Sequence, residues 1–274
     1  MNIEKIKEFA SRYEICDGHS HIFPEKIAEK ATVSIGDFYD IQMTGSGSVP
    51  ALLQSGKNIG VKKYLVCSTA TTAHQVESIN SFIATTCKEN PEFIGFGSMH
   101  PEHEDSFGQA KFCKENGLRG LKLHPDFQKF NIDDKSAYPI YEAAQAEGLP
   151  ILFHMGDNRY DYSSPARLKN ILRDFPNLIA FAAHLGGYQA WDKAAEVLTG
   201  EKNVYFDTCS SLMFISPETA KKQILNFGIE KIFFGTDFPM WGHLDELERF
   251  MTLGFSDEEN KLLLSENFKR FFSL

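Results

Sequence analysis

The sequence predicts an α/β fold of the (β/α)8 type, a TIM barrel, in one domain that covers residues 1–274. Two observations support this fold. Short apolar runs alternate with helix-like segments along the chain, which is the pattern of parallel strands joined by helical crossovers. Histidines and one aspartate also stand at the ends of several apolar runs, and the active sites of such barrels lie at the carboxyl ends of the strands. The length of 274 residues suits one barrel.

Eight segments are strand candidates, a number that suits a closed barrel better than an open sheet. They are 13–16, extended to the histidines that follow it, 63–68, 93–97, 120–124, 151–154, 178–184, 204–207 and 231–237. The helix-like segments between them are 73–90, 106–116, 136–147, 165–174, 191–198 and 217–227. Gly117, Gly148 and Gly228 each follow a helical segment, where a left-handed residue would end the helix.

Two further segments lie outside this alternation. Residues 25–60 form an inserted segment after the first strand, partly helical, with Gly45-Ser46-Gly47-Ser48 before a helix that starts at Val49-Pro50. Residues 256–274 open with a capping-box pattern, Ser-Asp-Glu-Glu, and carry apolar residues at helical spacing. We expect a C-terminal amphipathic helix that packs on the barrel.

The composition excludes several classes of protein. The formal charge of −9 disfavours binding to nucleic acid or to an anionic membrane, and no long uncharged apolar run or signal sequence is present. Five scattered cysteines indicate neither a disulfide framework nor a zinc ribbon. We expect a cytoplasmic protein that acts on a small molecule, and a homo-oligomer stays open.

The segment Asp17-Gly18-His19-Ser20-His21 carries the strongest chemical signal. Side chains alternate between the two faces of a strand, so His19 and His21 point the same way. A His-x-His pair can also consist of two ordinary histidines, so the interpretation depends on further candidate ligands.

Further candidates stand at the predicted ends of later strands: His154 after the fifth, His184 after the sixth and Asp237 after the eighth. Singly, His154 could be a core histidine, Asp237 a helix cap, and His184 part of a turn. Their joint occurrence at one rim favours a site. His19, His21, His154 and Asp237 could hold zinc, the expected ion, or another divalent transition metal, with a position left for water.

Together, five motifs resemble the amidohydrolase superfamily, and more narrowly its amidohydrolase-related branch, which includes aminocarboxymuconate-semialdehyde decarboxylase. The motifs are Asp17–His21, Gly120–Pro125, Phe153-His154, Ala183–Gly187 and Phe234–Pro239. The resemblance implies a metal, usually zinc, on the same four residues, and implies that His184 assists substrate binding or proton transfer. In relatives with two metals a carboxylated lysine can bridge the ions, and Lys122 is a candidate for that position, but it could equally bind an anionic substrate or be an ion-paired or packing residue.

The predicted reaction is hydrolysis of a small, carboxylated ester, lactone or amide. A divalent cation lowers the pKa of bound water, so that a hydroxide nucleophile exists near neutral pH. We expect Asp237 to accept the proton of that water, and His184 to polarise the carbonyl or to protonate the leaving atom.

Substrate-binding residues are expected on the loops. Arg159 could bind a carboxylate, and Tyr160 and Trp241 could line a ring pocket; an exposed loop and core packing are the competing interpretations.

Two other functions stay open. The alternative is a non-oxidative decarboxylase of an aromatic or unsaturated carboxylic acid that uses the same metal site. A third interpretation is a barrel without catalytic activity that serves as a binding protein.

Overall fold

The structure is a computed structural model that describes residues 2–274. The chain forms two compact units. The first contains the chain up to Val66 together with Thr208–Leu274, and the second is Cys67–Asp207. The prediction of one domain stays a prediction.

Within the described residues, the sheet has eight strands whose order in the sheet is their order in the chain, β1 to β8. All eight predicted strands are therefore present. The strands are β1 Ile15–His21, β2 Val61–Cys67, β3 Phe93–Ser98, β4 Gly120–Leu123, β5 Ile151–Phe153, β6 Ala180–Ala182, β7 Val204–Asp207 and β8 Ile232–Phe233.

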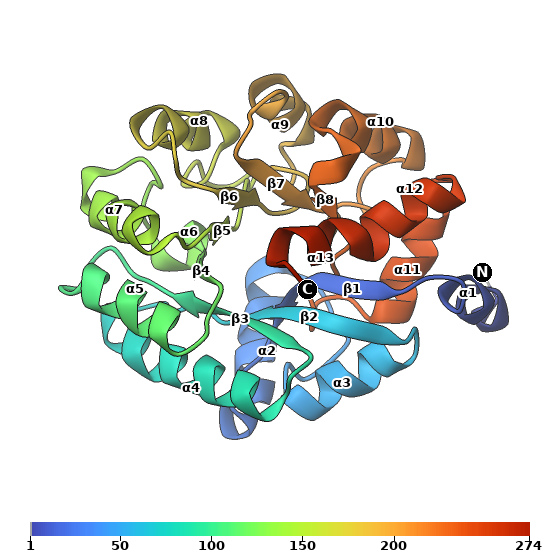
Figure 1. The fold of residues 1–274 in the computed structure, drawn as a ribbon, viewed down its shortest axis with the longest axis horizontal. Helices are drawn as coiled ribbons and strands as arrows, with labels where there is room; N and C mark the ends of the chain where they lie inside the picture. The colour runs from blue at the N-terminus through green and yellow to red at the C-terminus, as the bar shows by residue number, and fades with distance from the viewer. Residues whose placement is uncertain (1) are drawn as a thin grey trace. The chain divides into compact units, whose positions relative to one another are not determined.

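In the second unit, neighbouring strands from β3 to β7 pair in parallel, with Leu121 opposite Ile151 and Ile151 opposite Ala180. The helices that connect these strands lie along their outer side, as Figure 1 shows for α4 to α9. The helical elements of this unit are η1 Ala73–Gln75, α4 Val76–Glu89, α5 Ser106–Glu115, α6 Pro125–Gln128, η2 Lys135–Ala137, α7 Tyr138–Glu147, α8 Pro165–Asp174 and α9 Trp191–Leu198.

The first unit contains the inserted segment and the C-terminal helices. Its helical elements are α1 Ile3–Ala10, α2 Glu25–Tyr39, α3 Val49–Lys57, α10 Pro217–Phe227, η3 Ile229–Lys231, α11 His243–Met251, α12 Asp257–Lys261, η4 Leu262–Glu266 and α13 Asn267–Phe272. α3 begins after Ser48, whose hydroxyl accepts the backbone N–H of Ala51 at 3.4 Å, so the predicted helix start is confirmed. α12 begins with the predicted capping box at Ser256 and Glu259. The C-terminal helix contains a π-helical stretch, η4, that the sequence pattern did not indicate.

The ends of six strands differ from the prediction, by one residue in β2 to β5, by two in β6 and by four in β8. The fourth strand ends at Leu123, and His124 is the N-cap of α6. The sixth strand ends at Ala182, before His184 with φ +61°, and the eighth ends at Phe233, four residues before Asp237 with φ +56°. α11 was not predicted. Gly148, in contrast, adopts the left-handed conformation expected at the end of α7.

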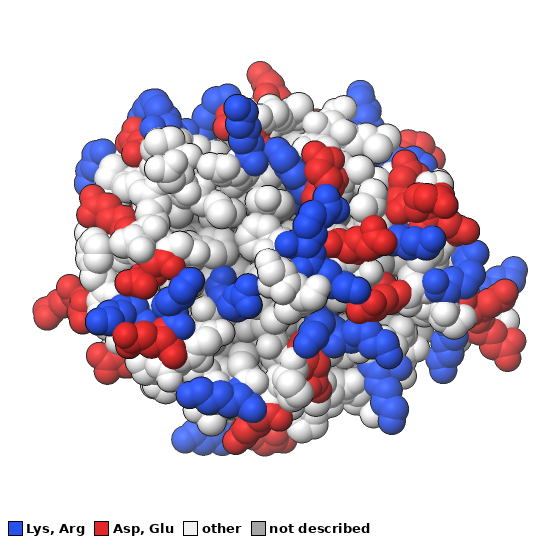
Figure 2. Space-filling model, viewed as in Figure 1, with Lys and Arg blue, Asp and Glu red and all other residues white. Residues whose placement is uncertain are grey.

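The core consists of the apolar side chains of the strands and of the inner faces of the helices. Leu65, Phe96, Leu121, Phe153 and Phe206, from five different strands, are at most 1% exposed. On the face drawn in Figure 2, Lys and Arg side chains are interspersed with Asp and Glu side chains. Among the described helices, none combines the length and the apolar character needed to cross a bilayer.

Candidate metal centre

The first unit brings three of the predicted ligands together. His19 and His21 lie at the end of β1 on the same face, and their Nε2 atoms are 3.2 Å apart. The Oδ1 atom of Asp237 lies 3.2 Å from Nε2 of His21 and 3.7 Å from Nε2 of His19. The backbone N–H of Asp237 also donates to the carbonyl of His19 at 2.8 Å, so that β1 and the segment after β8 are held in register.

These distances fit a shared divalent cation. Imidazole and carboxylate ligands lie about 2.1 Å from such a cation, which places neighbouring ligand atoms roughly 3.0 to 3.4 Å apart at angles between about 90° and 109°. Two of the three separations match this range, and the third is slightly longer. His19 is fully buried and Asp237 is 8% exposed, so their polar groups need partners other than bulk water. The three ligand atoms can therefore hold one divalent metal ion.

Asp17 forms hydrogen bonds with His19 and with residues next to the three clustered ligands. Its Oδ1 atom accepts the backbone N–H groups of His19 at 3.1 Å and Thr236 at 3.0 Å. Its Oδ2 atom accepts the hydroxyls of Ser20 and Thr236, and Nε2 of His243 lies 3.0 Å from the same oxygen. Asp17 and His243 are both fully buried. One carboxylate thus connects the end of β1, the segment after β8 and the start of α11.

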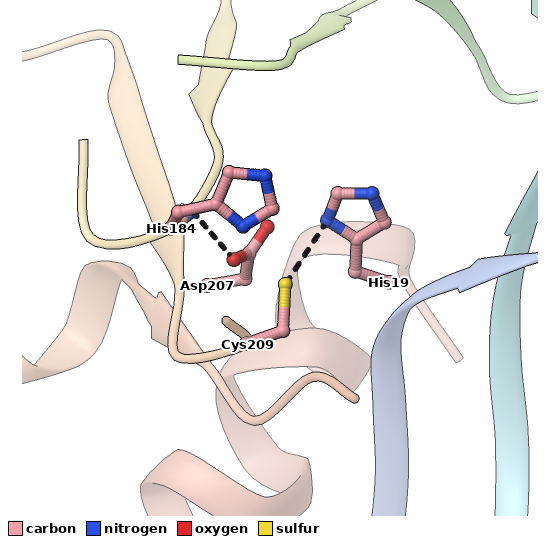
Figure 3. Close-up of side chains that lie close together, drawn as sticks. All are labelled: His19, His184, Asp207 and Cys209. Atoms are coloured by element: carbon pink, nitrogen blue, oxygen red, sulfur yellow. Dashed lines mark hydrogen bonds between the residues drawn. The ribbon is translucent and has the colours of Figure 1, made fainter. Parts of the chain in front are cut away.

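The segment after β7 contributes two more contacts. The Sγ atom of Cys209 lies 3.4 Å from Nδ1 of His19, as Figure 3 shows, and the hydroxyl of Ser210 donates to Oδ2 of Asp237 at 2.7 Å. The indole N–H of Trp241 donates to the same hydroxyl at 3.0 Å. Trp241, which was predicted to line a ring pocket, therefore has a hydrogen-bonded connection to Asp237 through Ser210.

The second unit holds the other two predicted histidines. The backbone N–H of His184 donates to Oδ1 of Asp207 at 2.8 Å (Figure 3), and its Nε2 lies 3.0 Å from Nδ1 of His154. Nε2 of His154 is 3.1 Å from the carbonyl of Gly156. Because a carbonyl only accepts, this nitrogen carries the proton when the bond forms, and Nδ1 then accepts from Nε2 of His184. The assignment of His154 as a metal ligand stays a prediction.

His154 also belongs to a second group of potential ligands, with His124 and Asp126. The His124 ring stacks on the rings of Phe127 and His154, with centroids 3.7 and 3.9 Å away. Asp126 has Oδ2 3.3 Å from Nε2 of His154. Burial, together with the negative charge of Asp157, raises the pKa of Asp126 to about 7.

The predicted substrate-binding residues of this unit have varied surroundings. Arg159 donates to both carboxylate oxygens of Asp157, from Nε at 2.9 Å and from Nη2 at 2.7 Å. Tyr160 is exposed and stacks on Tyr162 with centroids 5.6 Å apart. Lys122 is fully buried in β4. Their roles in substrate binding stay predictions.

Sequence reasoning missed the roles of Asp17, Asp126, Cys209 and Ser210. Cys209 was interpreted as a buried apolar residue or a free thiol, and Asp17 only as the first residue of a motif. The available signal was position: Cys209 and Ser210 directly follow the predicted seventh strand, at the end where the other site residues occur. Backbone conformation adds a second signal that only the structure reveals, since His184, Ser210 and Asp237 all have positive φ, a strain that concentrates at functional sites.

Comparison with known proteins finds one curated relative and many similar structures. The relative is 2-amino-3-carboxymuconate-6-semialdehyde decarboxylase from Dictyostelium discoideum, 26% identical over 200 residues, which are 59% of this chain and 55% of the relative. The chain thus spans about half the length of the curated relative that it matches.

Two solved structures illustrate the fold. A TIM-barrel protein from Bordetella bronchiseptica is 17% identical with a TM-score of 0.78, and the match covers 95% of this chain and 98% of the other. A 5-carboxyvanillate decarboxylase from Novosphingobium aromaticivorans, solved with manganese and 3-methoxy-4-hydroxy-5-nitrobenzoic acid, is 15% identical with a TM-score of 0.72, covering 96% and 97%. The predicted TIM-barrel fold is confirmed.

The expectation of a hydrolase is wrong. The curated relative is a decarboxylase, and several of the similar structures are named as decarboxylases as well. The error arose because the ligand motifs are shared by hydrolases and decarboxylases, so the motifs alone do not distinguish the reactions. The choice of zinc is not supported either, since manganese is the ion named for the similar structures.

The family itself is shown by a match to nearly the whole chain. The sequence model of the family described as "Amidohydrolase" matches residues 16–274. The predicted resemblance is therefore confirmed, and this protein belongs to the amidohydrolase family.

Proposed function

We propose that this protein is a divalent-metal-dependent, non-oxidative decarboxylase of an aromatic or unsaturated carboxylic acid. The observation that carries the proposal is the convergence of Nε2 of His19, Nε2 of His21 and Oδ1 of Asp237, with separations of 3.2 to 3.7 Å. The name of the curated relative supports the reaction class. The aromatic acid bound in the similar carboxyvanillate decarboxylase supports a small aromatic or unsaturated acid as substrate.

The reaction needs a proton at one carbon atom. The bond between that carbon and the carboxylate breaks, CO₂ leaves, and the carbon keeps the electron pair and takes up one proton. When bound, a divalent cation supplies positive charge that holds the oxygens of the substrate and stabilises negative charge on it. The chain must then deliver the proton.

Asp237 is the proposed proton carrier. Its Oδ2 atom accepts the hydroxyl of Ser210, and this bond fixes the carboxyl group while Oδ1 faces the two histidines. A positioned acid of this kind contributes about 10²- to 10⁴-fold to a rate. His184 is the proposed second group for substrate binding or proton transfer, and the carboxylate of Asp207 holds its backbone.

The proposed ion is Mn²⁺, with Zn²⁺ as the ion predicted from the sequence. Two imidazoles and one carboxylate suit either ion, so the ligand types do not select between them. Manganese is named for similar structures, which supports testing it first. His154 is the proposed further ligand, on the grounds of the sequence motifs.

Arg159 is the proposed partner of a substrate carboxylate, with Tyr160 and Trp241 as proposed ring contacts. The guanidinium of Arg159 already donates two hydrogen bonds to Asp157. A substrate carboxylate would therefore have to share the guanidinium with Asp157 or displace the Asp157 carboxylate from it. Lys122 is fully buried, and the role proposed for it is an electrostatic effect on an anionic substrate.

The test is release of CO₂ from a panel of aromatic and unsaturated carboxylic acids. Protein purified without chelator is analysed for metal, loaded with Mn²⁺ or Zn²⁺, and assayed beside Asp237→Asn. We expect CO₂ from at least one acid and a loss in kcat of about 10²- to 10⁴-fold in the variant.

Asp133→Asn is the matched control, since its carboxylate contacts Arg167 and Asn170 rather than the metal cluster. The control should keep the wild-type rate. A metal-loaded protein that releases no CO₂ from any acid, or an Asp237→Asn variant with the wild-type rate, would contradict the proposal.

A further inference from the structure

The segment that follows β7 contacts two of the three clustered ligands with two consecutive side chains. Cys209 lies against His19, and Ser210 lies against Asp237. Both contacts are on the side of the ligand that faces away from the cluster, because they involve Nδ1 of the imidazole and Oδ2 of the carboxylate. The atoms left toward the cluster are Nε2 and Oδ1.

The contact with His19 selects a tautomer. An imidazole that binds a cation through Nε2 must carry its proton on Nδ1, so Nδ1–H is then the donor and needs an acceptor. The sulfur of Cys209, at 3.4 Å, is placed to accept that proton. Both residues are fully buried, so water does not compete for this position. In this arrangement the thiol sulfur takes the place of the carboxylate or carbonyl oxygen that usually accepts the second ring N–H of a ligating histidine.

The contact with Asp237 selects a rotamer. The hydroxyl of Ser210 donates to Oδ2 at 2.7 Å and itself accepts the indole N–H of Trp241 at 3.0 Å. Because the hydroxyl has one proton, the Trp241 donor directs that proton toward Asp237. The guanidinium of Arg249 packs over the Trp241 ring at 4.8 Å and restricts the indole. The carboxylate is thereby held with Oδ1 toward the two histidines.

The backbone of the segment is fixed to the eighth strand. The N–H of Thr208 donates to the carbonyl of Phe233 at 3.1 Å, and the Thr208 hydroxyl accepts the N–H of Gly235 at 3.3 Å. Ser210 has φ +50°, an unfavourable conformation for a residue with a side chain, and this turn directs its hydroxyl to Asp237. The strain persists because these hydrogen bonds determine the path of the chain.

We propose that Cys209 and Ser210 are positioning residues of the metal centre: the Cys209 sulfur accepts the Nδ1–H of His19, and the Ser210 hydroxyl holds Oδ2 of Asp237. The proposal rests on the proposed function in so far as that function requires a bound cation. It goes beyond that function because it assigns the affinity of the site for metal to a thiol and a hydroxyl that do not bind the metal.

The experiment compares the full-length variants Cys209→Ala, Cys209→Ser and Ser210→Ala. The matched controls are Cys113→Ala and Ser265→Ala, which remove a buried thiol and a buried hydroxyl elsewhere in the chain. The dissociation constant for Mn²⁺ is measured by competition with a chelator. The absorption spectrum of the Co²⁺-loaded protein reports the ligand geometry, and the melting temperature of the metal-free protein reports the fold.

We expect Mn²⁺ to bind about 10- to 100-fold more weakly to Cys209→Ala and Ser210→Ala, with a changed Co²⁺ spectrum. Cys209→Ser should recover part of the affinity, because a hydroxyl can accept the same proton although its oxygen lies farther from Nδ1. The two controls should bind Mn²⁺ like the wild type even where the metal-free melting temperature falls.

The proposal is overturned when the Cys209 and Ser210 variants bind Mn²⁺ as tightly as the wild type. It is also overturned when the two control variants lose as much affinity for Mn²⁺ as the Cys209 and Ser210 variants lose. A wild-type protein that binds neither ion overturns it together with the metal requirement of the proposed function. A protein that binds metal through this arrangement but releases no CO₂ supports the positioning roles and contradicts only the decarboxylase.

Discussion

Replacing Asp17 with Asn should strongly destabilise the protein. Oδ1 of Asp17 accepts two backbone N–H groups, from His19 and Thr236, and Oδ2 accepts two hydroxyls and faces Nε2 of His243. Each of the four hydrogen-bonded groups donates to a fully buried carboxylate. Asn replaces one of these acceptors with an NH₂ group, which is itself a donor.

The size of the destabilisation is estimated from the hydrogen bonds that an Asn side chain at position 17 cannot form. In the better orientation, the Asn oxygen replaces Oδ1 and keeps the two backbone bonds, because backbone N–H groups cannot turn away. The NH₂ group then faces Nε2 of His243 and the hydroxyls of Ser20 and Thr236. Loss of about two hydrogen bonds to a charged group, at roughly 1.5 to 3 kcal/mol each, predicts a destabilisation of about 3 to 6 kcal/mol. This is a large part of the roughly 5 to 15 kcal/mol that stabilises a typical domain.

The assay is urea unfolding of the metal-free protein, with metal affinity measured in parallel. We expect a lower unfolding midpoint and weaker Mn²⁺ binding, since Asp17 holds the backbone of His19. Asp133→Asn is the control: Asp133 is partly exposed and contacts Arg167 and Asn170, so a change of about 1 kcal/mol or less is expected. An Asp17→Asn protein within about 1 kcal/mol of the wild type, with normal metal binding, would refute the reasoning.

Three further predictions concern pH, metal and charge. Burial raises the pKa of Glu246 to about 8, although Arg249 lowers it, so the folded state keeps a proton that the unfolded chain releases near pH 4.5. Stability should therefore fall between about pH 5 and 8 by up to about 1.4 kcal/mol per pH unit. Urea unfolding of Glu246→Gln should lack this slope, and an unchanged slope would rule out Glu246 as its source. Removal of the metal with a chelator should lower the melting temperature reversibly, by the equivalent of about 2.7 kcal/mol for an ion present at 100 times its Kd; no shift would argue against a bound ion. Arg159→Ala should destabilise the protein by roughly 1 to 3 kcal/mol, because it removes two hydrogen bonds from the Asp157 carboxylate, which is 0% exposed, and it should raise KM for an acid substrate. Equal KM values for the variant and the wild type would exclude Arg159 as a partner of the substrate carboxylate.

The helices and strands were largely predictable, because their signals are local. Proline and serine at the start of α10, at Ser216-Pro217, and glycine after its end, at Gly228, act within one turn of the helix. The ends of β6 and β8 were not predictable, since the apolar runs continue beyond Ala182 and Phe233, where the strands end. An apolar run indicates a strand but does not mark where the chain turns.

The candidate site was partly predictable for the same reason. The pairing of His19 with His21 follows from the two-residue period of a strand, which is a local property. Asp237 was predicted from its place after an apolar run, and its 3.2 Å approach to His21 agrees with that placement. The roles of Asp17 and Cys209 were missed, because they depend on contacts with residues more than 180 positions away, Thr236 and His19 respectively.

The sequence by itself determined the family, the alternation of strands and helices, and the residue types that can bind a metal. Those properties are encoded in short patterns, whose periodicity and capping residues act over a few positions. Only the tertiary structure decided which nitrogen of His19 faces a sulfur, and which oxygen of Asp237 faces a hydroxyl. Such choices depend on hydrogen-bond distances of about 3 Å between distant segments, and no local pattern specifies them.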